Sequence, residues 1–305
     1  MRLMIAFIFN LLIVGAAWSA CDGREIKKAV QDAPVCIPAD PQRIVVLDPL
    51  LTIGMMQEMD VPVAGVSFLG IQDDDLRKAV EDSGTVDLGH PAEPSLERIV
   101  ALKPDLIIGA AYLNLPIYEK ISTLAPTVLI DTLDWKEHYR VLADMVGKSE
   151  VAETSLQTYE ERAAQLKEKL PDTTVSVLRI APGRFQVYLD SPVAYAPYAV
   201  LQDVGIKRSD YETTPKEEVV KRPTWEELSQ LDGDILFYVV VSGYEQGPDD
   251  ALEEETLANP LWQTLPAVKA GHAYRVGRPT WMGFHGVESA FRVLDDVEEY
   301  VLNAQ

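Results

Sequence analysis

Two side chains next to apolar segments have the chemistry of ligand contacts. Arg179 follows the apolar run Val175 to Leu178, where a buried strand is expected to meet solvent. A guanidinium in that position is costly unless it finds an acceptor, and the oxygen atoms of a ligand can provide one. Trp281 lies in 279–283, which lacks helical or strand periodicity, so core patterning does not explain its ring. We expect Arg179 and Trp281 to hold a ligand together.

Further aromatic and polar residues follow predicted strands. In open parallel sheets, ligands bind beyond the carboxyl ends of the strands. Aromatic rings there supply contact area, and polar groups supply hydrogen bonds. The predicted ligand contacts in addition to Arg179 and Trp281 are Tyr112, Asn114, Tyr195, Tyr244, Phe284 and His285.

The sequence lacks the motifs of several other kinds of site. It contains no Gly-x-Ser-x-Gly elbow, no Walker phosphate loop and no Gly-x-Gly-x-x-Gly motif, so we predict neither enzymatic activity nor a cofactor. The 4 histidines are scattered, and no pair has the i, i+4 spacing of a helical zinc site, so we predict no metal held by the protein. The formal net charge of −21 argues against nucleic acid as a partner.

The N-terminus has the pattern of a signal peptide. Arg2 precedes an uncharged, mostly apolar run from Leu3 to Val14, and small residues follow it. Residues 1–20 are therefore predicted to direct export. No later segment reaches the roughly 20 apolar residues that cross a bilayer, so the mature chain is expected to be soluble unless a lipid anchors it.

The two cysteines, Cys21 and Cys36, allow two alternatives. Cleavage just before Cys21 would let its sulfur carry a lipid, although Trp18 stands where such sites usually have an aliphatic residue. Cleavage slightly earlier would let Cys21 form a disulfide with Cys36, worth about 3 kcal/mol in the chain-entropy model. The alternatives exclude each other because both use the Cys21 sulfur.

Two α/β segments flank a helical region. Arg43–Leu47 and Val61–Val66 are typical of buried parallel strands, and the residues between them have helical spacing. Helical patterning fills 134–170, and strand-like runs resume at Val175–Ile180 and Ile235–Val241. We therefore predict a signal peptide over 1–20, an N-terminal α/β lobe over 21–133, a helical segment with the inter-lobe helix over 134–170, and a C-terminal α/β lobe over 171–305.

The two predicted lobes contain a similar helix-then-strand unit. The spacing from Glu97 to Asp105 equals that from Glu226 to Asp234, and each aspartate opens an apolar strand. A serine or threonine precedes each glutamate as a potential helix cap. This repetition indicates two lobes of one design.

The chain resembles the periplasmic iron-siderophore and vitamin B12 binding proteins, particularly their ferric-citrate and hydroxamate branch. The resemblance covers nearly everything after residue 37. The resemblance rests on the segments Pro41–Leu47, Pro94–Ile108, Ala125–Val128, Asn259–Trp262 and Trp281–Asp296.

This resemblance implies a fold, a function and a partner. It implies two α/β lobes, each a mainly parallel sheet flanked by helices, joined by a single long rigid helix (class III), with the ligand between them. It also implies a periplasmic monomer that delivers a ferric siderophore, whose chelator holds the iron, to an ABC permease dimer in the inner membrane. Glu97 and Glu226 would pair with permease arginines. A cobalamin or haem receptor on the same scaffold is the alternative.

One departure from the family concerns the charge of the ligand. Relatives that hold acidic siderophores often have an arginine where this chain has Tyr112-Leu113-Asn114. Together with the net charge of −21, this favours a neutral or weakly charged hydroxamate complex.

Overall fold

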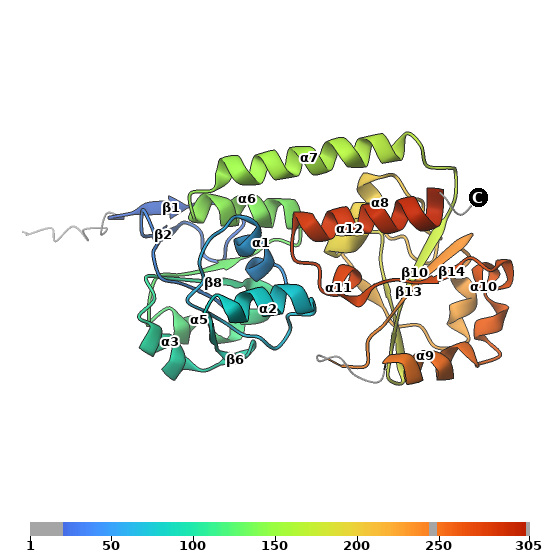
Figure 1. The fold of residues 1–305 in the computed structure, drawn as a ribbon, viewed down its shortest axis with the longest axis horizontal. Helices are drawn as coiled ribbons and strands as arrows, with labels where there is room; N and C mark the ends of the chain where they lie inside the picture. Colours follow the sequence, from blue (N-terminus) through green and yellow to red (C-terminus); the bar gives the residue numbers. More distant parts are fainter. Residues whose placement is uncertain (1–20, 244–248, 303–305) are drawn as a thin grey trace, which may run out of the picture.

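The computed structural model describes residues 21–243 and 249–302, which form two α/β lobes under a layer of helices (Figure 1). The first lobe holds a five-stranded parallel sheet in the order β5-β4-β3-β8-β9. Its strands are short and apolar, because helices or loops cover both faces of the sheet. They are β3 (Ile44–Val46), β4 (Gly65–Val66), β5 (Val86–Asp87), β8 (Leu106–Ala110) and β9 (Thr127–Ile130).

Short helices and two small hairpins complete the first lobe. The helices are α1 (Thr52–Glu58), α2 (Asp74–Asp82), α3 (Leu96–Leu102), α4 (Ala111–Asn114), the 3-10 turn η1 (Leu115–Ile117) and α5 (Tyr118–Ile121). The hairpins are β1 (Arg24–Ile26) with β2 (Val35–Ile37), and β6 (Gly89–His90) with β7 (Glu93–Pro94).

The second lobe holds a five-stranded mixed sheet in the order β12-β11-β10-β13-β14. The pairs β10–β13 and β13–β14 are parallel, whereas β11 is antiparallel to both of its neighbours. The strands are β10 (Val175–Ala181), β11 (Arg184–Tyr188), β12 (Val220–Lys221), β13 (Ile235–Val240) and β14 (Ala273–Arg275). The helical elements are α8 (Ala196–Asp203), η2 (Glu227–Gln230), α9 (Asp249–Leu257), η3 (Trp262–Thr264), α10 (Pro266–Ala270), α11 (Arg278–Trp281), α12 (Val287–Val297) and the π-helical turn η4 (Glu298–Leu302).

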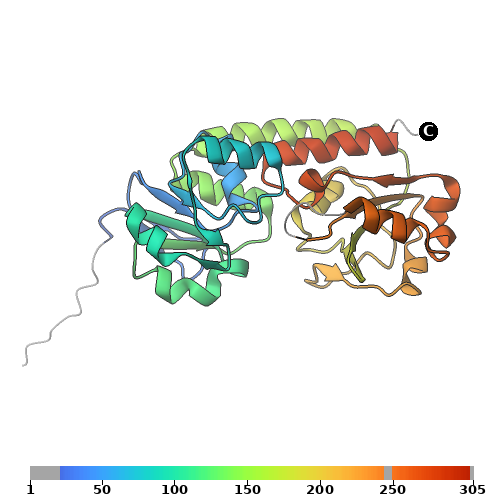
Figure 2. The ribbon, with the colours of Figure 1, turned by 60° about the horizontal axis from the view of Figure 1, so that its bottom comes forward.

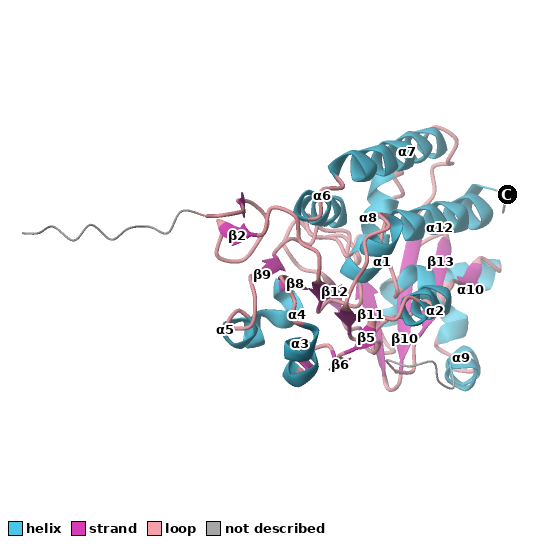
Figure 3. Cartoon of the chain, turned by 60° about the vertical axis from the view of Figure 1, so that its left-hand side comes forward, coloured by secondary structure: helices cyan, strands magenta, loops and turns pink. Residues whose placement is uncertain are grey.

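Helices α6 (Trp135–Met145) and α7 (Ser149–Lys167) connect the lobes. Helix α7, whose 19 residues extend about 28 Å, contacts α6 near its N-terminal end and α8 and α12 further along. Figures 1 and 2 show α7 running across the top of both lobes with α12 alongside, and Figure 3 shows α6, α7, α8 and α12 gathered on the same side of the molecule. Arg162 of α7 forms ion pairs with Asp295 and Glu298. The predicted fold class is confirmed.

The repeated unit has the same architectural role in both lobes. Asp105 accepts hydrogen bonds from the backbone N–H groups of Gln42 and Arg43, at 2.9 and 2.8 Å, just before β3. Asp234 accepts one from the N–H of Thr174, at 3.0 Å, just before the corresponding strand β10. Each carboxylate thus fixes the register between two adjacent parallel strands.

The helical parts of the repeat differ. Ser95 caps α3 by accepting a hydrogen bond from the Arg98 N–H at 3.3 Å, as predicted. Thr224 and Glu227 exchange the reciprocal bonds of a capping box, but only the short 3-10 turn η2 follows. The predicted helix is therefore wrong, because Ser229, Asp232 and Gly233 are weak helix formers.

The N-terminal hairpin contains a disulfide. Cys21 and Cys36 are bonded, and their Cα atoms lie 5.7 Å apart. No helix within the described residues is long and apolar enough to cross a membrane.

Candidate ligand-binding cleft

A cavity of about 390 Å³ opens between the lobes at the carboxyl end of β10. This cavity, called here the arginine cavity, takes two residues from the first lobe, Leu50 and Gln72, and the others from the second. Those of the second lobe are Arg179, Ala181, Pro182, Arg184, Tyr188, Tyr195, Val241, Ser242, Gly243 and Met282. It lies where an α/β sheet is expected to bind its ligand.

Arg179 is the central cation of the arginine cavity. Strand β10 holds it, and its Nη1 donates to the Tyr188 Oη at 3.3 Å. Its Nε is buried and has no hydrogen-bond partner within the part of the chain that the structure describes. A buried guanidinium N–H without an acceptor is costly, so a ligand oxygen that fills this position is strongly favoured.

Three tyrosines form an aromatic wall beside Arg179. The ring of Tyr188 stacks on Tyr195 at 5.2 Å and on Tyr198 at 4.6 Å between centroids. Burial raises the pKa of Tyr195 well above its ordinary value, and the nearby Arg179 lowers it only in part. The phenol of Tyr195 therefore stays neutral at physiological pH and can donate a hydrogen bond as well as contribute contact area.

The first lobe contributes Tyr112, whose position is fixed by Asp48. The fully buried Asp48 carboxylate accepts hydrogen bonds from the N–H groups of Leu50 and Thr52 at the start of α1 and from the Thr52 hydroxyl. The Tyr112 Oη also donates to it, at 3.1 Å. The Tyr112 side chain is 52% exposed, so its ring is available to a ligand.

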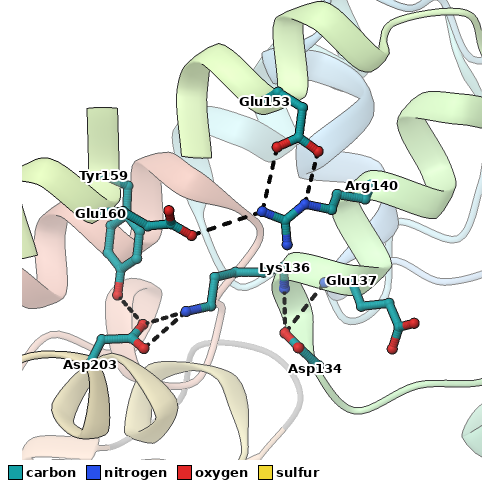
Figure 4. Close-up of polar contacts among 8 residues, drawn as sticks. All are labelled: Asp134, Lys136, Glu137, Arg140, Glu153, Tyr159, Glu160 and Asp203. Atoms are coloured by element: carbon teal, nitrogen blue, oxygen red, sulfur yellow. Dashed lines mark hydrogen bonds and ion pairs between the residues drawn. The ribbon is translucent and has the colours of Figure 1, made fainter. Parts of the chain in front are cut away.

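A second cavity of about 650 Å³, called here the acidic cavity, begins at Tyr112 and extends toward α6 and α8. Its carboxylates are Asp131, Asp134, Asp203 and Glu217, and its cation is Lys136. Lys136 already pairs with Asp203, at 2.9 Å, and the Tyr159 Oη donates to the same carboxylate at 2.7 Å (Figure 4). Because Lys136 is on α6 and Asp203 on α8, this ion pair also ties the connecting helix α6 to the second lobe.

Other polar contacts join the lobes away from the two cavities. Glu58 of α1 accepts hydrogen bonds from the backbone N–H groups of Val287 and Glu288 at the start of α12, and burial raises its pKa to about 6. Arg292 pairs with Asp73 at 2.6 Å. These contacts, with α7, favour a rigid connection between the lobes.

Trp281, predicted to cover the ligand, lies instead in the core. Its side chain is 0% exposed and packs edge-on against Tyr198 and Phe237. Its indole N–H donates to Asp296 at 2.6 Å. The prediction was wrong because 278–281 forms the helix α11, which directs the ring against the second sheet, and the arrangement of Trp281 opposite Arg179 across the cleft is not found.

Three other predicted contacts are also buried away from the cavities. Phe284 packs edge-on against Trp135, and Asn114 bonds the Ala110 N–H and the Pro91 carbonyl. His285 lies within 3.4 Å of Asp73 and contacts Arg292. All three side chains contact other parts of the fold and do not line either cavity, and Tyr244 lies outside the described residues.

The structure brings Arg179 and Tyr195 together in one cavity and places Tyr112 at the adjoining one. Arg184, Tyr188 and Asp48 are not among the predicted ligand contacts, although Asp48 and Arg184 lie in segments at predicted strand ends, where the ligand was expected. Arg184 and Asp48 follow apolar runs, which is a usable signal, whereas Tyr188 is recognisable only once the antiparallel pairing of β11 with β10 is known.

Glu97 and Glu226 are exposed at matching points of the two lobes. Glu97 lies in the first turn of α3, and Glu226 directly precedes η2. Neither carboxylate forms an ion pair with another described residue. No group of three or more potential metal ligands occurs among the described residues.

A buried histidine supports Asp48 from behind. The Thr52 hydroxyl donates to Asp48, so it must accept from the Nε2–H of His138, 3.0 Å away. The Nδ1 of His138 is then a bare acceptor, and it has no partner within the described chain. Burial lowers the pKa of His138 to about 4.

This pKa predicts acid sensitivity. Between pH 6.5 and about 4 the unfolded chain binds a proton that the folded chain does not, so stability falls as the pH drops, by up to about 3 kcal/mol. His138→Gln keeps a donor for Thr52 and should remove this part of the loss in urea unfolding at pH 7 and pH 4.5. His272→Gln, at an exposed site, is the control and should behave as wild type. Equal acid sensitivity in His138→Gln and wild type would contradict the assignment.

The fold and the cleft define a class, the two-lobed solute-binding proteins. More particularly, the chain belongs to the periplasmic binding protein family, whose model matches residues 51–280. Members of this family bind the substrates of transporters and are not enzymes.

Individual relatives agree with this membership. The probable siderophore-binding lipoprotein YfiY of Bacillus subtilis (strain 168) is 30% identical over 340 residues, covering 100% of both chains. The Fe(3+) dicitrate-binding periplasmic protein FecB of Escherichia coli (strain K12) is 27% identical, covering 97% of this chain and 95% of its own. The structure of FeuA from Bacillus subtilis complexed with ferri-bacillibactin superposes with a TM-score of 0.78, covering 92% of this chain and 99% of its own at 23% identity, which shows a shared fold.

Proposed function

We propose that this protein captures a ferric siderophore between its lobes and delivers it to an ABC permease. The observation that carries the proposal is the buried, unpartnered Nε of Arg179 beside the Tyr188 and Tyr195 rings, in a cavity between two lobes. A siderophore satisfies its iron with its own oxygens, so its receptor needs outer hydrogen-bond donors and aromatic surface. The names of YfiY and FecB support the same class of ligand.

Calorimetric titration with a panel of ligands tests this proposal. Ferric siderophores should bind with a Kd below about 10 μM, corresponding to about −7 kcal/mol, whereas cobalamin and haem should not. If only cobalamin or haem binds tightly, the protein is a receptor for that ligand on the same scaffold and not a siderophore receptor. If no member of the panel binds, the proposal fails.

Delivery to the permease is assigned to Glu97 and Glu226. One exposed carboxylate on each lobe, at the same point of a repeated unit, suits a permease dimer that offers cations to both lobes at once. Such charge pairs set register and encounter rate more than affinity. The protein acts as a monomer in this arrangement, with one lobe over each permease subunit.

The exported protein is proposed to lie free in the periplasm. The Cys21 sulfur takes part in a disulfide with Cys36 and so cannot carry a lipid. Peptide mass spectrometry of protein from its native compartment should find a peptide pair linked through Cys21 and Cys36 that separates on reduction. A diacylated Cys21 would contradict this assignment and establish the lipid anchor, and two free thiols would exclude both forms.

A further inference from the structure

The two cavities of the cleft have opposite charge. Arg179 and Arg184 line the arginine cavity, and none of its described lining residues is acidic. The acidic cavity has four carboxylates against the single Lys136, which Asp203 already neutralises. In a chain with a net charge of −21, a cavity with two cations and no carboxylate among its described lining residues is a local exception.

Arg208, in the same lobe, shows how this fold neutralises a buried arginine. Arg208 forms an ion pair with Glu212, four residues later, and both side chains are almost fully buried. Arg179 has no such carboxylate within the described chain, and its Nη1 donates a hydrogen bond to the Tyr188 hydroxyl. The fold thus neutralises Arg208 internally and leaves the charge of Arg179 available to the cavity.

Arg184 extends this positive charge toward solvent. It is exposed at the start of β11, directly after the β10–β11 turn, and forms no ion pair with a described residue. Arg179 and Arg184 therefore present one half-buried and one exposed cation along the same wall. Guanidinium groups bind carboxylate and other anionic oxygens with charge-assisted hydrogen bonds that are stronger than those to neutral acceptors.

The acidic cavity disfavours anionic groups of a ligand. Asp131 and Glu217 are exposed and have no ion pair among the described residues, so an anionic arm of a ligand would be repelled there. Tyr112, whose hydroxyl is held by Asp48, stands at the boundary of this cavity. The cleft thus distinguishes ligands by where their charged groups lie as well as by the sign of their charge.

We infer that the ligand is a net-negative ferric chelate whose anionic oxygens face Arg179 and Arg184 and whose opposite side is neutral or cationic. This inference rests on the proposed function and names its substrate class. It replaces the expectation of a neutral hydroxamate complex. That expectation depended on the missing arginine in the Tyr112–Asn114 loop, but the positive groups come from the opposite lobe.

Calorimetry with ferric chelates of different charge tests the inference. The probes are an anionic ferric citrate-type chelate, an anionic tris-catecholate, a neutral tris-hydroxamate and a cationic tris-hydroxamate. At least one anionic chelate should bind about tenfold or more tightly than either hydroxamate. Arg184→Gln should weaken anionic binding about three- to tenfold and neutral binding less than about twofold.

The control for Arg184→Gln is Arg77→Gln, which removes the same charge from a partly exposed site on α2, outside both cavities, and should leave every affinity unchanged. Tightest binding of a neutral or cationic chelate would overturn the inference while the proposed function stands. Equal weakening of all chelates by Arg184→Gln would also overturn it, because the effect would then not depend on ligand charge. Binding of none of the four would overturn the proposed function itself.

Discussion

Reversing the charge of Glu97 and Glu226 together is expected to abolish siderophore-dependent iron uptake while leaving ligand affinity within about threefold of wild type. Both carboxylates are exposed, and neither lines the arginine cavity or the acidic cavity. In Glu97→Lys/Glu226→Lys, cations on both lobes would face the cations expected on the permease, and like charges across an interface cost several kcal/mol. Uptake of labelled ferric chelate by cells, and calorimetry on the purified variant, measure the two quantities.

The matched control is Glu119→Lys/Glu254→Lys, which places the same charge change on an exposed surface of each lobe, on α5 and on α9. It should take up iron as wild type does. Loss of uptake in the control would attribute the effect to net charge and not to docking. Loss of ligand affinity in the Glu97/Glu226 variant would show that the carboxylates serve the ligand site.

Much of the architecture could be predicted because it follows from local patterns. The apolar runs before Asp48 and after Asp105 and Asp234 correspond to β3, β8 and β13, and the long Glu- and Ala-rich stretch corresponds to α7. The equal spacing from Glu97 to Asp105 and from Glu226 to Asp234 also indicated the repeat, since each aspartate fixes one strand register in the structure.

The ligand site was less predictable because it depends on contacts between distant segments. Trp281, Phe284 and His285 lack periodicity in sequence, yet each packs against residues far away in the chain. Because these residues lack periodicity, we expected a loop with exposed side chains. Short helices and turns, however, also bury large side chains. Aromatic residues near strand ends therefore belong to the core as often as to the cleft in this protein.

Acidic neighbours in the sequence distinguish Arg208 from Arg179. Arg208 has Glu212 four residues later, a spacing that allows an ion pair, and the structure contains that pair. Arg179 has no acidic residue within five positions on either side. Local sequence alone is not a sufficient signal, because Arg278 also has no acidic residue within five positions and yet pairs with Asp249, 29 residues earlier.

Replacing Arg179 is expected to weaken ligand binding more than replacing Arg184 does. Arg179→Met keeps an unbranched side chain but removes every guanidinium donor, so affinity for the cognate chelate should fall about 10- to 100-fold, or about 1.5 to 3 kcal/mol. Arg179→Lys keeps the charge without the planar donor geometry, so its affinity should lie between those of wild type and Arg179→Met. Stability in urea should be unchanged or higher in Arg179→Met, because a buried N–H without a partner is removed.

Trp281→Phe provides the contrasting variant. It removes the hydrogen bond to Asp296 and part of a fully buried ring, so unfolding stability should fall by about 2 kcal/mol while chelate affinity stays within about twofold. Arg179→Met should therefore reduce binding without reducing stability, whereas Trp281→Phe should reduce stability without reducing binding. If Trp281→Phe lost affinity at unchanged stability while Arg179→Met bound normally, the chelate would lie against the indole, and the arginine cavity would not be the ligand site.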